Sequence, residues 1–364
     1  MVSPKSFWIV VLVLALCPML ALAGNPASRY NVLSPIQSGN LTIYPVTSAT
    51  THNTSAFLTL DEGVRNGSVV VTEAGQVAGL IRRRGQHPVN TGGEVNRLVL
   101  INNSDRPLLL LAGEIVTGGK QDRVIGTDRI VPPKSEPVDL SVFCVEPGRW
   151  VARSENFSSM HGQMAQPSVR MPAMAKKSQA LVWDNVRESN RNAAAAAPSA
   201  GAVLGGTTSY ADVMQNGEVQ RKIDSVAAPI DRDDGKVIRQ LKQQNAVGVV
   251  VAVNGRLVWA DVFASGELLE DYWPKLIRSY AAEAVTGGVY KDRTQQLSAQ
   301  QFIDSLSGTR EVAETDPGVF RRSEISGEGY KVFTLTSLLP KMEFTVHLAK
   351  MTEEQGNRVV PTIE

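Results

Sequence analysis

The sequence has few of the residues on which disulfide-rich proteins depend. Only two of its 364 residues are cysteines, and Cys17 lies in an apolar N-terminal segment. Removal of that segment would leave Cys144 alone, which excludes an internal disulfide and leaves stability to the hydrophobic core. Cys144 lies in the apolar run 142–145, which favours a buried, inert thiol over a nucleophile.

Histidine is also scarce, which argues against a metal site. The sequence has four histidines, and none has a second histidine or a carboxylate at the spacing that places two ligands on one helix face. We therefore expect no metal and no cofactor. His347 lies in the apolar run 344–349, where a structural histidine is the simpler interpretation and a catalytic one the alternative.

The chain lacks an excess of charge of either sign. Lysine and arginine total 37 and aspartate and glutamate 36; without Lys5, in the N-terminal segment, the two totals are equal. A neutral chain gives no electrostatic reason to expect nucleic acid or an anionic membrane surface as a partner.

Three common catalytic or nucleotide-binding motifs are missing. The sequence contains neither the Gly-x-Ser-x-Gly elbow of the α/β-hydrolases nor a Rossmann glycine fingerprint. The pair Gly119-Lys120 resembles the end of a phosphate-binding P-loop, but Gly113 is one place out of register. Gln121 also replaces the hydroxyl residue that holds magnesium, so a P-loop NTPase is excluded.

The N-terminus has the pattern of a signal peptide. Lys5 precedes an apolar run, and Ala21 and Ala23 form a small-residue cleavage site. We expect cleavage after Ala23 and export to the periplasm or medium, without stable membrane insertion afterwards. Lipidation at Cys17 is less favoured, because the large Leu16 precedes it.

The remaining chain predicts an α+β fold. Apolar runs at 98–101 and 108–116, separated by a polar turn, predict a hairpin, and the Asn-Gly pair at 254–255 predicts a second one. A helix is expected over 269–284, with Pro274 either in a first turn capped by Asp271 or at a kink. The expected organisation is a signal peptide at 1–23, an extended leader at 24–38, a β-rich half ending in a helix at 39–191, an Ala/Gly-rich loop at 192–206, a hairpin–helix–strand half at 207–351 and a tail at 352–364.

The densest mixture of glycine and charge follows the run 108–116 and is the candidate site. Two glycines can present backbone N–H groups to an anion, while nearby cations add charge. A glycine-rich turn with surface charges is the alternative. The ligand-binding candidates in this loop are Gly118, Gly119, Lys120, Gln121 and Arg123.

Three further residues belong to this candidate site. Glu114 continues an inward face with period two, so its carboxylate needs a partner, for which Lys120, Arg123 or Arg149 is available. It is either a structural ion pair or a ligand-orienting group with a shifted pKa. Glu146 and Arg149 follow the run that carries Cys144 and are expected to fold over the loop.

Several segments resemble one known family. They are residues 108–123, which read LLLLAGEIVTGGKQDR, residues 144–150, CVEPGRW, and residues 273–280, WPKLIRSY. These segments are similar to the domain family named for association with ADP-ribosylglycohydrolase and rhodanese-phosphatase proteins. The resemblance covers about residues 39–351. It implies that both halves form one unit, and it adds Asp261, Lys275 and His347 as second-half site candidates. It implies no particular reaction, because the family is named after its neighbours.

Three functions remain open from the sequence. The first is an exported binding module for a small anionic ligand, phosphate- or nucleotide-like, held by Lys120 and Arg123 and oriented by Glu114. The second is a hydrolase in which Glu114 or Glu146 activates water and His347 or a lysine assists. The third is a structural envelope protein without a small-molecule site. Convergence of the candidate side chains on one pocket would favour the first two.

Overall fold

The structure is a computed structural model that describes residues 29–74, 97–149, 153–154, 156–231, 238–239, 241–287 and 298–353. The expected signal peptide, its cleavage site and Cys17 lie outside the described residues, as does the tail beyond residue 353. No helix within the described ranges is both long and apolar enough to cross a membrane.

An antiparallel nine-stranded sheet joins the start of the chain to its end. The order is β1-β3-β14-β15-β19-β18-β17-β16, and β2 pairs with β3. Because β3 pairs with β14, a strand of the first half lies inside the sheet of the second half. The strands are β1 (Tyr30–Val32), β2 (Ile36–Ser38), β3 (Leu41–Ser48), β14 (Ala246–Val253), β15 (Arg256–Phe263), β16 (Thr309–Asp316), β17 (Phe320–Gly327), β18 (Tyr330–Ser337) and β19 (Thr345–Thr352).

The first half builds two more sheets. A seven-stranded sheet has the order β11-β6-β5-β13-β8-β9-β12, and a three-stranded sheet has the order β10-β7-β4. The strands are β4 (Leu58–Thr59), β5 (Val69–Glu73), β6 (Leu98–Asn102), β7 (Leu108–Leu110), β8 (Glu114–Thr117), β9 (Arg123–Ile125), β10 (Arg129–Val131), β11 (Val138–Leu140), β12 (Val142–Cys144) and β13 (Asn156–Met164).

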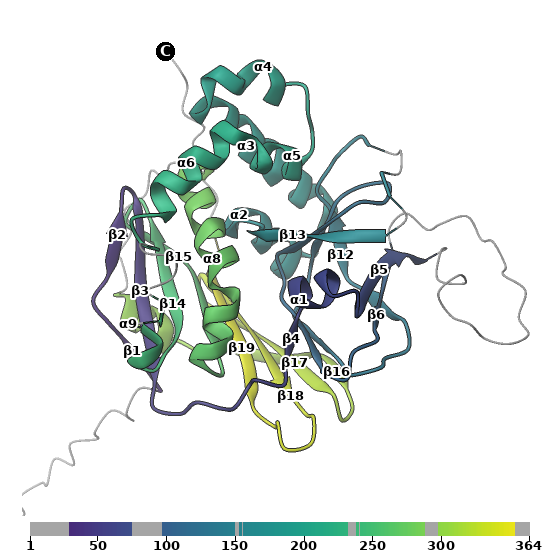
Figure 1. The fold of residues 1–364 in the computed structure, drawn as a ribbon. Coiled ribbons are helices and arrows are strands. Elements are labelled where there is room, and N and C mark those ends of the chain that lie inside the picture. The colour runs from purple at the N-terminus through teal and green to yellow at the C-terminus, as the bar shows by residue number, and fades with distance from the viewer. Residues whose placement is uncertain are drawn as a thin grey trace, which may run out of the picture.

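Helix α8 (Gly266–Thr286) lies between the two large sheets and contacts both β13 and β14 (Figure 1). A group of helices covers one end of the molecule, where α3, α4, α5 and α6 lie together in Figure 1. The other helices are α1 (Leu60–Arg65), α2 (Pro167–Met171), the π-helix η2 (Pro172–Lys176), α3 (Gln179–Ala196), the 3-10 helix η3 (Pro198–Ala200), α4 (Gly201–Leu204), α5 (Tyr210–Gln215), α6 (Gly217–Ala227) and α9 (Ala299–Asp304).

Helix α8 begins earlier than its sequence pattern predicts. The Ser265 hydroxyl accepts a hydrogen bond from the backbone N–H of Leu268, so Ser265 is the N-cap. Of the two alternatives predicted for Pro274, the first turn capped by Asp271 is therefore wrong, because Pro274 lies inside the helix. Apolar residues on several faces of α8 are buried, as expected of a helix packed between two layers.

One predicted hairpin is present and the other is wrong. Strands β14 and β15 pair across Asn254 and Gly255, whose φ angles of 53° and 76° are those of a type I′ turn. Strands β6 and β7 do not pair: β6 lies between β5 and β11, and β7 lies between β4 and β10. Their apolar runs are completely buried in different sheets, and such runs do not reveal their partners.

The Ala/Gly-rich segment is more helical than expected. Helix α3 continues through Ala196, and η3 and α4 follow it, so short helices replace the predicted loop over most of 192–206. Alanine has the highest helix propensity, which explains the extension of α3.

Both halves share one hydrophobic core, which runs from Leu41 in β3 to Met351 in β19 and includes Tyr272 and Leu276 of α8. The predicted α+β fold, with a β-rich first half packed as one unit against the second, is confirmed.

Candidate functional site

The loop after β8 is held in shape by its own aspartate. The backbone N–H of Gly118 donates to Asp122 Oδ1 at 3.0 Å. Gly118 has a φ of 136°, and a Cβ atom there would lie 2.5 Å from the Ser154 hydroxyl oxygen. Only glycine suits both this backbone conformation and this close approach. Cβ at Gly119 would likewise meet the Phe157 ring, at 2.3 Å.

Arg149 also holds the loop in shape. Its Nη1 donates to the carbonyl of Gly119 at 2.9 Å, and its Nη2 lies 3.3 Å from Asp122 Oδ1. Its Nε forms an ion pair with Glu146 Oε2 at 2.6 Å. The structure thus brings Glu146 and Arg149 to the glycine loop, as the sequence predicted, and uses both to fix its shape.

Arg153 forms ion pairs with three carboxylates near the loop. It binds Asp212 of α5 through two nitrogens, with Nη1–Oδ1 at 3.2 Å and Nη2–Oδ2 at 3.0 Å. Its Nη2 lies 3.4 Å from Glu146 Oε1, and its Nη1 lies 4.0 Å from Asp122 Oδ2. The Arg153 side chain is 47% exposed, whereas that of Asp122 is fully buried.

Asp122, Arg153 and Asp212 line an open cleft of about 270 Å³. The surface at Gly118 is therefore hollow rather than flat. Hydroxyl and amide groups complete its polar wall. The lining residues are Thr117, Gly118, Asp122, Arg153, Ser154, Ser158, Ala211, Asp212 and Gln215.

The environment of the cleft shifts the pKa of Asp122. Burial raises the pKa of its carboxyl, and the negative charge of Glu146 adds to the rise. The hydrogen bond from Gly118 and the charges of Arg149 and Arg153 oppose it. A carboxyl group with a raised pKa at the wall of a polar cleft is a candidate for binding a hydroxyl group or for acid–base chemistry.

The other loop candidates do not line the cleft. The backbone N–H of Lys120 donates to Glu73 Oε1 at 3.0 Å. Arg123 is fully buried, and its Nη1 donates to the carbonyl of Asp122 at 3.3 Å. Burial also lowers the pKa of its guanidinium. Gln121 is fully buried, and its side-chain amide has no hydrogen-bond partner among the described residues.

Glu114 forms a separate buried ion pair. Its Oε1 lies 2.7 Å from Lys275 Nζ of α8, which also lies 2.8 Å from Asp61 Oδ2. Its Oε2 accepts a hydrogen bond from the backbone N–H of Leu111 at 2.8 Å. The predicted partners of Glu114 are therefore wrong, because its partner comes from a helix about 160 residues later. Burial raises the pKa of Glu114, while Lys275 opposes the rise.

Asp261 and His347 belong to a third cluster. Arg170 Nη1 and Nη2 donate to the two carboxylate oxygens of Asp261, at 2.9 and 3.1 Å. His347 lies between two carboxylates, with Nδ1 2.7 Å from Asp128 Oδ2 and Nε2 3.2 Å from Asp261 Oδ1. Asp128, Arg170, Asp261 and His347 are almost completely buried.

The candidate residues consequently fall into three groups rather than one pocket. The cleft contains Gly118 and lies beside Glu146 and Arg149, but Glu114, Asp261, Lys275 and His347 do not line it. The sequence pattern did not predict Asp122, Arg153 or Asp212 as site residues. Asp122 belongs to the charged run 118–123, so its position in the sequence could have indicated it as a site residue. Nothing in the sequence connects Asp212 to that run.

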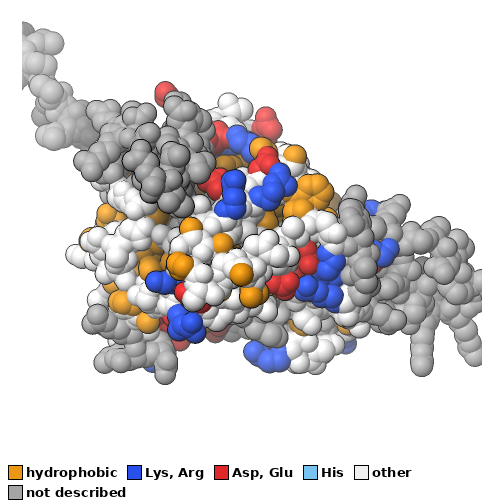
Figure 2. All heavy atoms as spheres, turned by 90° about the horizontal axis from the view of Figure 1, so that it is seen from above, with side chains coloured by type: hydrophobic (Ala, Val, Ile, Leu, Met, Phe, Trp, Pro, Cys, Tyr) orange, Lys and Arg blue, Asp and Glu red, His pale blue; other side chains and the backbone are white. Residues whose placement is uncertain are grey.

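Charges of both signs are interspersed on the face shown in Figure 2, with apolar side chains between them. The described part of this face has no extended area of one sign, in keeping with the nearly neutral composition.

A family model matches residues 29–350. The model describes the ARG and rhodanese-phosphatase-superfamily-associated protein domain, ARPP-1. The chain belongs to this family. The match covers the three sheets, α8 and all three charged clusters, so the ARPP-1 domain includes the cleft and both buried networks. Searches of curated proteins and of solved structures found no match. The site of this ARPP-1 domain must therefore be interpreted from its own geometry.

Proposed function

We propose that this protein is a binding module for a small polar ligand that carries an anionic group, bound in the cleft beside Gly118. The proposal rests on the half-exposed side chain of Arg153, which lines a polar cleft and whose guanidinium lies between Asp122 and Asp212. Arginine binds phosphate and carboxylate groups through paired N–H donors. The sequence pattern predicted that Lys120 and Arg123 bind the anionic group of the ligand. In this proposal Arg153 binds it instead.

The carboxylates restrict the kind of ligand. Asp122, Asp212 and the nearby Glu146 outnumber Arg149 and Arg153, so a simple anion would meet net negative charge. A ligand that also offers hydroxyl or amino hydrogens would satisfy the aspartates while its anionic group contacts Arg153. Sugar phosphates and nucleotides have this combination. The volume of about 270 Å³ suits a single such unit, since pockets for larger, drug-sized ligands span about 300–1,000 Å³.

Calorimetric titration tests the proposal. Ribose 5-phosphate and AMP should bind more tightly than inorganic phosphate or ribose, each of which supplies only half of the contacts. Arg153→Ala should weaken binding about tenfold or more, the loss expected for one charge-assisted contact. Arg187→Ala is the matched control, because Arg187 is a similarly exposed arginine of α3 whose ion-pair partner is Asp184. Equal affinities in Arg153→Ala and the unsubstituted protein would refute the proposal.

A second candidate function is hydrolysis, with Asp122 as the acid–base group. The raised pKa of the Asp122 carboxyl in the cleft favours it. In this version Asp122 takes the role predicted for Glu114 or Glu146, whose carboxylates are bound to Lys275 and Arg149. Slow turnover of a bound sugar phosphate, lost in Asp122→Asn with binding retained, would support the enzyme. Binding without turnover would contradict the hydrolase and support the binding module.

We also propose that the protein is exported through its N-terminal segment. The support is the order of charge, apolar run and small residues in residues 1–23. N-terminal sequencing of protein recovered from a bacterial host should begin at Gly24. A chain that retains Met1 in the cytoplasmic fraction would contradict export.

A further inference from the structure

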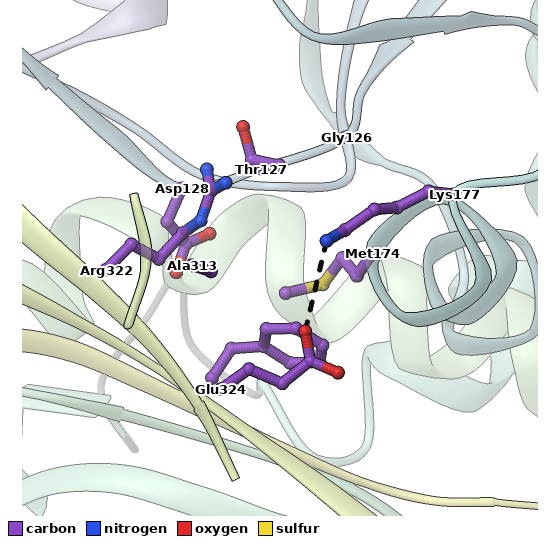
Figure 3. Close-up of a pocket in the computed structure, with 9 residues that line it drawn as sticks. Gly126, Thr127, Asp128, Met174, Lys177, Ala313, Arg322 and Glu324 are labelled. Atoms are coloured by element: carbon purple, nitrogen blue, oxygen red, sulfur yellow. Dashed lines mark ion pairs between the residues drawn. The ribbon is translucent and has the colours of Figure 1, made fainter. Parts of the chain in front are cut away.

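A second, narrower hollow lies between the β9–β10 turn, the end of η2 and the strands β16 to β18. Its volume is about 10 Å³, about enough for the centre of one water molecule. It shares no lining residue with the cleft beside Gly118. Figure 3 shows its polar side chains, which come from Thr127, Asp128, Lys177, Arg322 and Glu324.

Two cations from opposite walls face this hollow. Arg322 extends from β17 toward Thr127 and Asp128, and Lys177 extends from the end of η2 on the other side (Figure 3). The Arg322 side chain is only 10% exposed. Its Nη1 lies 3.0 Å from Glu314 Oε2 but makes no aligned hydrogen bond with any described residue. A buried guanidinium N–H without an aligned acceptor favours an additional oxygen ligand.

Lys177 is equally available to a ligand. Its Nζ lies 4.0 Å from Glu324 Oε2, beyond hydrogen-bond distance, and its side chain is 54% exposed. The other oxygen of Glu324 is bound by Lys331. The left-handed backbone conformation of Lys177, with a φ of 48°, ends η2 and sets the direction in which the side chain leaves the helix.

The charge around the hollow is positive. Lys177 and Lys331 share Glu324, while Arg129 and Arg322 share Glu314, which gives four cations and two carboxylates. Asp128 does not reverse this balance, because its Oδ2 is paired with His347 and its Oδ1 accepts the N–H of Ala112. The site therefore suits a group with one or two negative charges.

The rest of the wall is apolar and consists of Met174, Ala313 and Phe333. We propose that this hollow is a binding site for a small monocarboxylate. Its carboxylate lies between Lys177 and Arg322, and its short alkyl group contacts Met174 and Phe333. Because the hollow itself admits about one water, binding of acetate requires the side chains of Met174 and of the half-exposed Lys177 to move apart.

Ligand-observed NMR titration of the full chain with acetate tests this site. Acetate and propionate should give saturable binding in the millimolar range, while the bulkier pivalate should not bind. Lys177→Ala should weaken acetate binding at least fivefold. Lys176→Ala is the matched control, because Lys176 is the preceding residue, is also exposed, and pairs with Glu353 outside the hollow. Arg322→Gln should abolish binding, provided that its circular dichroism spectrum is unchanged.

The proposal is overturned if acetate does not saturate, or if Lys177→Ala and Lys176→Ala bind acetate equally well. Competition by chloride with no preference for carboxylates would assign the hollow to simple anions and also overturn it. Because Arg153 is not part of this hollow, Arg153→Ala should bind acetate normally, which separates this test from that of the proposed cleft.

Discussion

Arg170 and Asp261 form two parallel hydrogen bonds, at 2.9 and 3.1 Å, and both side chains are fully buried. Arg170 belongs to α2 of the first half and Asp261 to β15 of the second. The Arg170 guanidinium also lies over the Trp259 ring, 4.4 Å from its centroid, and its Nε donates to the carbonyl of Ala112. This pair therefore holds together layers that are distant in the sequence.

Loss of one partner of this pair should strongly lower the free energy of unfolding. Arg170→Met leaves the Asp261 carboxylate buried with only His347 and Tyr280 beside it, so we expect a loss of about 3–5 kcal/mol in the free energy of unfolding. Urea denaturation measures it. The double variant Arg170→Met/Asp261→Asn should lose less than the sum of the single variants, because the unpaired charge is gone. Strict additivity would show that the pair contributes nothing.

The contribution of His347 to the free energy of unfolding should fall between about pH 6.5 and pH 9. Burial alone lowers the pKa of His347, but Asp128 and Asp261 outweigh burial and raise it from 6.5 to about 9. The folded state then binds a proton that the unfolded state releases, so this contribution is complete below pH 6.5 and disappears as the pH rises through 9. It amounts to roughly 3 kcal/mol. Lys350, whose pKa is lowered to about 7 by burial, contributes in the opposite direction, so the unsubstituted protein is compared with His347→Gln at each pH. The difference between their unfolding free energies should shrink as the pH rises from 6.5 to 9.

Glu114 should matter for stability rather than for ligand binding. Glu114→Gln removes the charge that faces Lys275 in a buried pair, and we expect a loss of about 2–4 kcal/mol of unfolding free energy. Binding of a sugar phosphate in the cleft should be unchanged at temperatures where the variant is folded. If Glu114→Gln lost ligand binding but kept full stability, Glu114 would be part of the functional site.

Gly118→Ala tests the shape of the loop. The new methyl group would approach Ser154 Oγ to 2.5 Å and the carbonyl of Asn156 to 2.9 Å, and it would also require an unfavourable φ. Both thermal stability and cleft binding should decrease, with a loss of about 1–3 kcal/mol in unfolding free energy. Gly67→Ala is the control: its φ is also positive, at 74°, but no atom lies within 4 Å of the added group. It should lose stability and keep binding.

The sequence predicted those features that depend on local patterns. The β14–β15 hairpin was recognised because Asn-Gly is one of few pairs that suit its turn. The burial of Cys144 was confirmed, since an apolar run is seldom exposed. Glu146, Arg149 and the glycine loop were correctly brought together, because short spans of chain separate them.

Strand partners and charge partners were decided by the tertiary structure. The buried runs of β6 and β7 are compatible with many neighbours, and only packing of the whole chain assigned them to different sheets. Likewise, a carboxylate that needs a cation does not reveal which one: Lys275, far along the chain, reached Glu114 because α8 passes between the layers.

By itself, the amino-acid sequence determined the α+β class and the position of the glycine loop, which follow from periodicity and local turns. It also determined the family, through the resemblance of segments such as 108–123 and 273–280. The cleft, the two buried ion networks and the Lys177–Arg322 hollow exist only after folding. Their members come from separate elements, and the free energy that unites them comes from burial of a core shared by both halves.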